Sequence, residues 1–198
     1  MKTIARHGYA RTTMAHVAGT AGLSQGIVNF YFDSKESLLY ETLVHLAGEY
    51  EAILRRALEN AGPDPVRALD AMIETDLGPE VCTPVKSALW LAFWAESRGR
   101  PTYAKLCQSL NTNYCRQVSD LCTALIEQNG YRGLDPDVMA VGFVALIDGF
   151  WADLSVAPDN MDRERAKTAC RAYFAGFFPA EFGPLAAASD KLLTRRAG

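Results

Sequence analysis

The sequence predicts an all-α fold with a small N-terminal helical domain and a larger C-terminal one. Past residue 40, helix-length segments follow one another, each bounded by Gly, Pro or Asp. No alternating apolar and polar pattern of any length indicates a strand. Residues 12–38 carry a helix-turn-helix pattern that leads directly into a third helix. With 198 residues, 49% of them hydrophobic, the chain can bury a sizeable core, and we place the domain boundary between residues 1–47 and 48–198.

The first helix of this pattern begins at Thr12 or Thr13, whose hydroxyl can accept a hydrogen bond from the following turn. Its inward face has apolar residues at intervals of three and four, namely Met14, Val17, Ala18 and Ala21. Gly22 follows where a helix end needs a residue that tolerates positive φ, and Leu23 is expected to tuck beneath the turn. These features together predict two helices joined by a tight turn.

The second helix is predicted over residues 25–32, with Ser24 as its N-cap. Gln25 and Asn29 are four residues apart and therefore share a face. Each amide can bond an adenine edge in a bidentate manner, while Gly26 lets the backbone approach the floor of a DNA groove. Gln25 and Asn29 could equally be ordinary solvated residues, and this alternative stays open.

Aromatic and basic residues near the end of the second helix suit phosphate contacts. Val28 and Phe32 are expected to point into the domain core, whereas Tyr31 and Lys35 are placed for phosphates, which fix position without reading sequence. Ser34 caps the next helix, whose positive end adds to such contacts. The residues expected to bind DNA are Thr13, Ser24, Gln25, Gly26, Asn29, Tyr31 and Lys35.

The rest of the chain reads as a series of helices. They are expected at about residues 35–58, 65–78, 83–98, 102–129, 137–156 and 163–178. Residues 179–198 predict an extra short helix or a frayed tail. The most apolar run, residues 138–156, contains Asp148 and Asp153 and is interrupted by Gly142 and Gly149, so it predicts a buried helix and no membrane partner.

Charge and cysteine content indicate a cytoplasmic protein with a mildly positive head. The net charge is −3, yet residues 1–47 carry four Lys or Arg against three Asp or Glu. No signal peptide is visible at the start. The cysteines are odd in number and include no C-x-x-C pair: Cys82, Cys107, Cys115, Cys122 and Cys170. We therefore expect reduced thiols, three of them at helical spacing as small apolar fillers.

The segment from Thr12 to Leu38 resembles the DNA-binding domain of TetR-family transcriptional regulators. The shared features are a Thr-rich helix start, an alanine–glycine turn, an aromatic helix end and a Ser-Lys-x-x-Leu entry into a long helix. The resemblance implies a homodimeric, all-helical repressor that releases double-stranded operator DNA when a small molecule binds its C-terminal domain. Asn29 departs from the pattern, since many members carry an aromatic residue there. Only Met1 to His7 precede Gly8, so the first helix is shorter than the resemblance implies, through a late start or a reduced helix.

Small and bulky apolar residues near the end of the chain form a candidate dimer contact. The small residues are Gly142, Ala145 and Gly149. The bulky residues are Tyr173, Phe174, Phe177 and Phe178. The pattern alone fits internal packing equally well. The resemblance favours the dimer, because family members pair through their last two long helices, and the two-fold symmetry of the operator would follow.

The three tryptophans and one carboxylate form a candidate effector site. Trp90 and Trp94 are four residues apart, and Trp151 lies three residues past Asp148. Aromatic faces with a partly desolvated carboxylate attract a quaternary ammonium. The alternative is that the tryptophans are core residues and that Asp148 caps a helix or pairs with an arginine.

The segments WLAFW and ALIDG-x-W also resemble choline-responsive repressors of the same family. This resemblance implies choline or a similar cationic amine as effector, and choline or glycine-betaine genes as targets. A second possibility keeps the fold but has a hydrophobic effector in an apolar cavity, with efflux or catabolic genes as targets. Operator sequence and the sign of regulation stay open.

Nothing in the sequence predicts an enzyme. There is no His-Glu-x-x-His, no phosphate-binding loop and no nucleophile elbow. The histidines, His7, His16 and His45, all lie in the predicted DNA-binding head. We therefore expect no catalytic residue, no metal and no cofactor.

Overall fold

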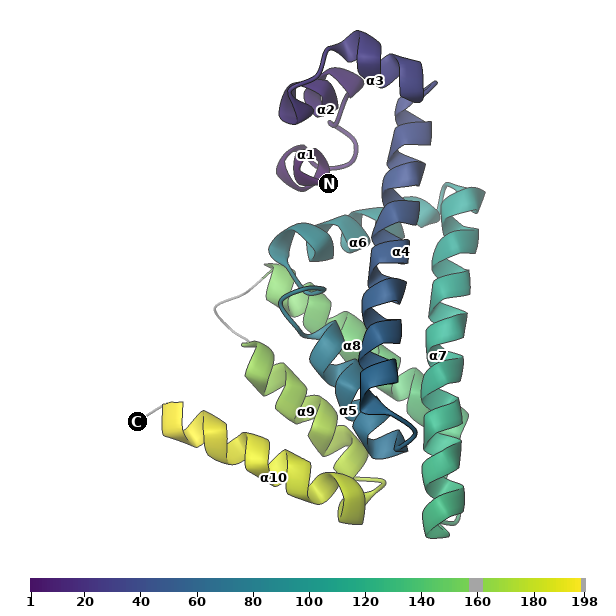
Figure 1. The fold of residues 1–198 in the computed structure, drawn as a ribbon, viewed down its shortest axis with the longest axis vertical. Coiled ribbons are helices and arrows are strands. Elements are labelled where there is room, and N and C mark those ends of the chain that lie inside the picture. The colour runs from purple at the N-terminus through teal and green to yellow at the C-terminus, as the bar shows by residue number, and fades with distance from the viewer. Residues whose placement is uncertain (157–161, 197–198) are drawn as a thin grey trace. The chain divides into compact units, whose positions relative to one another are not determined.

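The computed structural model describes residues 1–156 and 162–196, with side chains through residue 187, and every regular element in these ranges is a helix (Figure 1). The helices are α1 (Lys2–His7), α2 (Met14–Ala21), α3 (Gln25–Tyr31), α4 (Lys35–Ala61), α5 (Pro65–Asp76), α6 (Pro84–Ser97), α7 (Pro101–Asn129), α8 (Pro136–Val156), α9 (Arg163–Ala175) and α10 (Pro179–Arg196). The predicted all-α class is confirmed. The helix ends lie within a few residues of the predicted ones.

The ends of the short N-terminal helices follow from local chemistry. The side-chain oxygens of Thr13, Ser24 and Ser34 each accept a hydrogen bond from the backbone N–H three residues on, at 3.2, 3.3 and 3.0 Å. Such N-caps satisfy backbone donors that have no partner within the helix. Gly22 ends α2 with a φ of 68°, a left-handed conformation that favours glycine. The predicted turn and its caps are confirmed.

Two details of the predicted turn are wrong. Ala21 is exposed, and Ala18 is the buried residue of α2. Leu23 is 47% exposed instead of tucked beneath the turn. Its backbone N–H reaches back to the carbonyl of Ala18 at 2.9 Å, which is the bond that closes a glycine-terminated helix end. Side-chain burial at a turn thus depends on packing that the local pattern does not contain.

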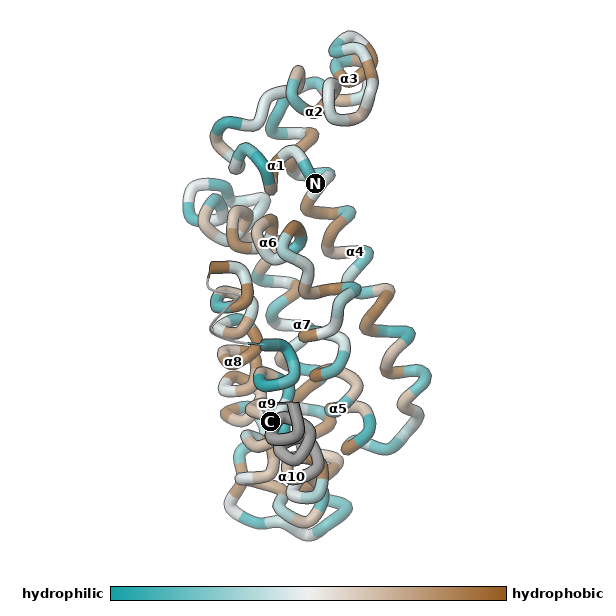
Figure 2. The backbone as a smooth tube through the Cα atoms, turned by 90° about the vertical axis from the view of Figure 1, so that its left-hand side faces the viewer, coloured by the Kyte–Doolittle hydropathy of each residue, from teal (hydrophilic) through white to brown (hydrophobic). Residues whose placement is uncertain are grey.

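Contacts divide the chain into two compact units. Unit 1 is Met1–Ala52 with Thr83–Leu110, and unit 2 is Ile53–Cys82 with Asn111–Gly198. Unit 1 therefore contains the N-terminal helices together with α6. Helix α4 contributes residues to both units, and Figure 2 shows hydrophilic and hydrophobic residues alternating along it, as in an amphipathic helix. The boundary at residues 47 and 48 stays a prediction.

An aromatic cluster joins the N-terminal helices to α6 and the start of α7 within unit 1. The buried hydroxyls of Tyr9 and Tyr103 are hydrogen-bonded at 3.0 Å. The Phe93 ring meets both tyrosines edge-on, with centroids 5.9 and 5.8 Å away. Tyr40 of α4 stacks on Tyr103 at 5.8 Å. Because these residues are distant in sequence, the cluster was not predictable from local patterns.

Unit 2 has a phenylalanine core. Phe143 of α8, Phe174 of α9 and Phe182 of α10 have no exposed surface. The Phe174 ring lies 4.9 Å from that of Phe143 and 5.1 Å from that of Phe182, distances typical of favourable aromatic pairs. Helices α9 and α10 lie side by side in Figure 1.

Residues 179–196 form one helix, so the extra helix is observed, and it is longer than predicted. Besides Phe182, a hydrogen bond of 2.7 Å from the Tyr131 hydroxyl to the Glu181 carboxylate holds its first turn. Residues 197 and 198 lie outside the described residues. The first turn of the predicted tail therefore packs against the rest of unit 2.

A network of ion pairs links α5 to α9. Arg171, 9% exposed, donates to Asp70 at 2.7 Å and to Glu74 at 2.5 Å. Lys167, 8% exposed, donates to Glu74 at 2.7 Å and to Glu164 at 3.1 Å. Burial opposes ionisation of Glu74, but the hydrogen bonds from Lys167 and Arg171 hold its pKa below the ordinary value of 4.5. The network satisfies two buried cations that would otherwise destabilise the fold.

Several residues predicted for a dimer contact pack inside the chain instead. The Tyr173 hydroxyl donates to the carbonyl of Met139 at 2.9 Å. It stands so close over Gly142 that a Cβ there would clash with it. Phe174 and Phe178 have no exposed surface. These four residues therefore bear out the internal-packing alternative, while other residues of α8 remain exposed.

Helix α8 combines a buried face with an exposed apolar one. By length and composition it could cross a membrane, and 33% of its most apolar stretch is buried. The exposed residues include Val138, Val141, Ala145, Gly149 and Val156, of which Val138 and Val141 are 65% and 63% exposed. At about 100° per residue these positions share one face. This face is free to pack against another surface.

Candidate functional site

Helix α3 presents nearly all of its side chains to solvent. Val28 is its buried residue, with 5% exposed. Gln25, Gly26 and Asn29 are exposed, as predicted for residues that enter a DNA groove. Phe30 is 82% exposed, which the sequence interpretation missed. A short helix held by one buried residue and a capped N-terminus is a projecting element that suits a groove.

The residues predicted to contact phosphates differ in their exposure and in the hydrogen bonds they already make. Tyr31 is 73% exposed at the end of α3. Lys35 donates from its ammonium to the carbonyl of Ala10 at 2.8 Å and lies 5.7 Å from the centre of the Tyr9 ring. An ammonium has three donors, so this bond leaves capacity for a phosphate. Thr13 and Ser24 are exposed and cap α2 and α3.

A basic surface lies beside this helix pair within unit 1. The rings of His7 and His16 stack with centroids 4.7 Å apart, and Arg11 donates to the carbonyl of His7 at 3.2 Å. Desolvation and then the neighbouring charges of His16, Arg6 and Arg11 lower the pKa of His7. Sequence reasoning recorded these residues only as a charge balance. Because they cluster, these residues are further candidates for contacts to DNA phosphates, which strengthen binding whatever the base sequence.

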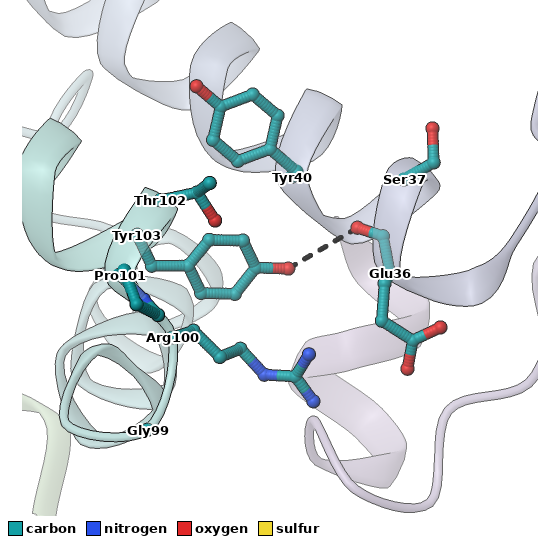
Figure 3. Close-up of a pocket in the computed structure, with 8 residues that line it drawn as sticks. All are labelled: Glu36, Ser37, Tyr40, Gly99, Arg100, Pro101, Thr102 and Tyr103. Carbon is teal, nitrogen blue, oxygen red and sulfur yellow. Dashed lines mark hydrogen bonds between the residues drawn. The ribbon is translucent and has the colours of Figure 1, made fainter.

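A pocket of about 400 Å³ lies between the first turns of α4 and α7 (Figure 3). Its walls include the stacked rings of Tyr40 and Tyr103, and the Tyr103 hydroxyl donates to the carbonyl of Glu36 at 3.4 Å. Arg100 lies over the rings of Tyr9 and Tyr103 at 5.4 and 5.7 Å. This junction ties the start of α4 to the α6–α7 turn within unit 1.

One half of the predicted effector site lies in unit 1. Trp90, 5% exposed, and Trp94 have ring centroids 6.4 Å apart on α6. Tyr50 of α4, which sequence reasoning missed, meets Trp90 edge-on at 6.5 Å. The structure thus brings together three aromatic rings, a composition that suits either a cation or an apolar ligand.

The other half lies on α8 in unit 2. Trp151 is 6% exposed and donates from its indole N–H to the carbonyl of Asp76 at 2.8 Å. Asp148 is half-buried, and no residue that the structure describes forms a hydrogen bond or an ion pair with its carboxylate. Burial raises its pKa to about 6. The predicted alternative of a helix cap or arginine partner for Asp148 is therefore not observed among these residues.

The two halves belong to different compact units, so their meeting in one cage stays a prediction. Within unit 2 the positions of Asp148 and Trp151, three residues apart on α8, place both side chains on neighbouring parts of one helix face. The charge of Asp148 adds to burial in raising the pKa of Cys115 on α7. Asp148 is thus a carboxylate whose ionised form is destabilised by burial, and a cation bound beside it would stabilise that form.

Asp76 is a buried carboxylate that sequence reasoning missed. It has no exposed surface and accepts a hydrogen bond from the Tyr114 hydroxyl. A signal was present, because Asp76 follows Met72 and Ile73 at intervals of four and three and so falls on the apolar face of α5. The Tyr114 ring stacks on Phe143 at 6.4 Å. Asp76 therefore serves the packing around Trp151.

The cysteines show no sign of chemical activity. All five are free thiols. Burial raises the pKa of Cys122 and of Cys170 to about 12, so both stay protonated at neutral pH. Burial also raises the pKa of Cys107. A thiol rather than a thiolate is a poor nucleophile, which agrees with the role of apolar filler predicted for Cys107, Cys115 and Cys122.

Two known protein families match this chain, one in its N-terminal part and one in its C-terminal part. Residues 1–42 match the bacterial regulatory proteins of the TetR family, and residues 65–179 match the family described as BetI-type transcriptional repressor, C-terminal. The HTH-type transcriptional regulator BetI of Paraburkholderia xenovorans is 33% identical over 83% of this chain and 82% of its own length.

Solved structures share the fold. A transcriptional regulator from Pseudomonas aeruginosa PAO1 superposes with a TM-score of 0.79 at 23% identity, covering 92% of this chain and 88% of the other. A transcriptional regulator from Saccharomonospora viridis, solved in complex with choline, has a TM-score of 0.74 at 21% identity, covering 86% of this chain and 88% of the other. At these identities the likeness concerns the fold.

Proposed function

The chain belongs to the TetR family of bacterial regulatory proteins and has a BetI-type repressor C-terminal domain, and on this premise we propose that it is a repressor released from its operator by choline or a similar cationic amine. Its relatives are transcriptional regulators, and the chain is a DNA-binding regulator, not an enzyme. Choline and glycine-betaine genes are the proposed targets. Such a regulator works in the cytoplasm, beside the chromosome.

Contact with operator DNA is proposed through α3 and its surroundings. Gln25 and Asn29 are exposed on the capped helix and have the amides that bond adenine edges. Gly26 allows close approach of the backbone. Thr13 and Ser24 cap α2 and α3, while Tyr31 ends α3 and Lys35 begins α4. These four residues are the proposed phosphate contacts, which set position.

The observation that carries the effector proposal is the carboxylate of Asp148. A half-buried acid whose pKa burial raises to about 6 is ionised but poorly solvated at neutral pH, so a cation that binds next to it stabilises its charge. Trp151 lies three residues further along the same helix. In the proposed site, this carboxylate and the rings of Trp90, Trp94 and Trp151 together surround the cation. The choline bound to the Saccharomonospora viridis regulator supports this ligand class.

Dimerisation is proposed through the exposed apolar face of α8. Its members are Val138, Val141, Ala145, Gly149 and Val156. Apolar surface of this extent on one helix is stabilised by burial, and a second copy of the chain supplies the same face under two-fold symmetry. The predicted strip thus keeps Ala145 and Gly149 but replaces Gly142, which Tyr173 covers.

A pair of ligands that match in shape and differ in charge tests the effector. Choline should quench the fluorescence of the three tryptophans, whereas dimethylbutanol, in which carbon replaces the quaternary nitrogen, should bind about 30-fold more weakly. This ratio corresponds to about 2 kcal/mol for a desolvated cation–aromatic contact. Titrations at pH 7.5 measure both affinities. Equal affinities, or binding of the neutral compound alone, would favour the hydrophobic effector and with it efflux or catabolic genes as targets.

A further inference from the structure

The centre of the exposed face of α3 is apolar. Residues of an α-helix advance by about 100° each, so the direction opposite the buried Val28 falls between Gly26 and Phe30. Gln25 and Asn29 lie on one flank of this centre, and Ile27 and Tyr31 on the other. Phe30 is 82% exposed and Ile27 is 44% exposed. The centre of the exposed face of α3 is therefore a phenyl ring next to a glycine.

The chemistry of α3 excludes the commonest contact to guanine. That contact is a bidentate hydrogen bond from Arg or Lys to the guanine edge, and residues 25–31 include neither. Amides on one flank bond adenine, and apolar groups contact the C5 methyl of thymine. The amide side chains of α3 thus suit adenine and its apolar side chains suit thymine, the two bases of an A·T pair.

We propose that Phe30, with Ile27 beside it, reads thymine methyl groups in the major groove, and that α3 consequently selects A·T pairs at the centre of each half-site. The inference rests on the proposed DNA-binding function. Tyr31 supports the ring position, because its own ring meets Phe30 edge-on at 5.3 Å and 89°. Gly26 has no side chain to hold the ring away from the groove floor, and a Cβ there would meet only the Ser24 hydroxyl at 3.8 Å.

Removal of the methyl group from DNA tests the contact without changing the protein. Duplexes that bind are selected from a random-sequence pool with the full-length wild-type chain. Each selected thymine is then replaced by deoxyuridine, which keeps the base pair and loses only the methyl. Affinity should fall about fourfold for each contacted methyl group, which corresponds to the free energy of burying one methylene. Selected half-sites should have A·T pairs at their centre.

Two variants assign the effect to Phe30. In Phe30→Ala the deoxyuridine replacement should cause no further loss at the thymines that Phe30 contacts, because that contact is already gone. In the control Asn29→Ala the fourfold sensitivity should persist, while preference for adenine at its own position is lost. Both residues are exposed, so both variants should keep the thermal melting of the wild type.

The outcomes distinguish a failure of the proposed role of Phe30 from a failure of DNA binding itself. If no duplex is enriched, the proposed DNA-binding function fails. If duplexes are enriched and bind thymine and deoxyuridine forms equally, or if half-site centres prove rich in G·C pairs, DNA binding stands and the role of Phe30 is wrong. If Phe30→Ala retains the full deoxyuridine penalty, another residue makes the methyl contact.

Discussion

Replacement of Asp148 by asparagine should weaken choline binding about 30-fold at pH 7.5. The change keeps the shape of the side chain and removes the charge that faces the cation. Loss of one partner of a desolvated charge pair costs roughly 2–5 kcal/mol, and the partial exposure of Asp148 places the expected cost near the lower limit. Tryptophan fluorescence titration measures it. The matched control is Asp153→Asn, an exposed carboxylate on the same helix, which should bind choline as the wild type does.

The pH dependence gives a second measure of the same carboxylate. With a pKa of about 6, Asp148 is mostly ionised at pH 7 and mostly protonated at pH 5. Choline affinity of the wild type should therefore fall about tenfold between these values, and that of Asp148→Asn should stay constant. An equal pH dependence in both proteins would show that Asp148 is not the cation's partner.

Rising pH should lower the folding stability through Asp148, whereas it should raise the affinity for choline. Because the folded pKa of Asp148 lies above its ordinary value of 3.8, its contribution to stability is full below pH 3.8 and is lost as the pH rises through about 6. Without ligand, Asp148→Asn should thus be the more stable protein at pH 8. Choline should reduce or reverse this difference.

Replacement of Arg171 by alanine should lower the free energy of unfolding by about 2–3 kcal/mol. The change leaves Asp70 and Glu74 without their shared partner. Breaking a fully buried pair costs roughly 3–5 kcal/mol, and the two carboxylates are 26% and 44% exposed, so water recovers part of the loss. Urea denaturation at a fixed protein concentration measures the change.

The control for this variant is an exposed ion pair in the same unit. Arg56 and Glu80 are 3.2 Å apart, with side chains 64% and 67% exposed, so Arg56→Ala should cost at most about 1 kcal/mol. The Arg171 effect should also shrink in acid. The pKa of Glu74 is lowered, so its contribution is present above the ordinary value of 4.5 and is lost as the pH falls through the folded pKa. Equal losses for both variants would contradict a structural role for the buried network.

Local chemistry made much of the fold predictable. Ser24 and Gly22 mark helix ends because a cap oxygen or a positive φ acts within a few residues. Phe30 was missed because only packing decides which aromatic residues of the run 30–32 face solvent: Phe30 and Tyr31 are exposed, and Phe32 is partly buried. Tyr173 was assigned to a dimer contact, since its proximity to Gly142 depends on how α8 and α9 cross.

The candidate effector site was predictable in its chemistry and less so in its surroundings. The spacing of Trp90 and Trp94, and of Asp148 and Trp151, follows from helix geometry. Tyr50 lies on another helix, and its contact with Trp90 has no counterpart in the local sequence. Asp76 could have been found, because the apolar face of α5 includes it. Pairings between distant segments were beyond the sequence patterns.

Release of DNA by choline is the most direct test of the account. Fluorescence anisotropy of a labelled duplex, selected from the random pool, is titrated with the protein at fixed salt, with and without millimolar choline. The account predicts tight binding that choline weakens by roughly 5–150-fold, the usual range of coupling between two sites. Tight binding of the duplex that is the same with and without choline would contradict it.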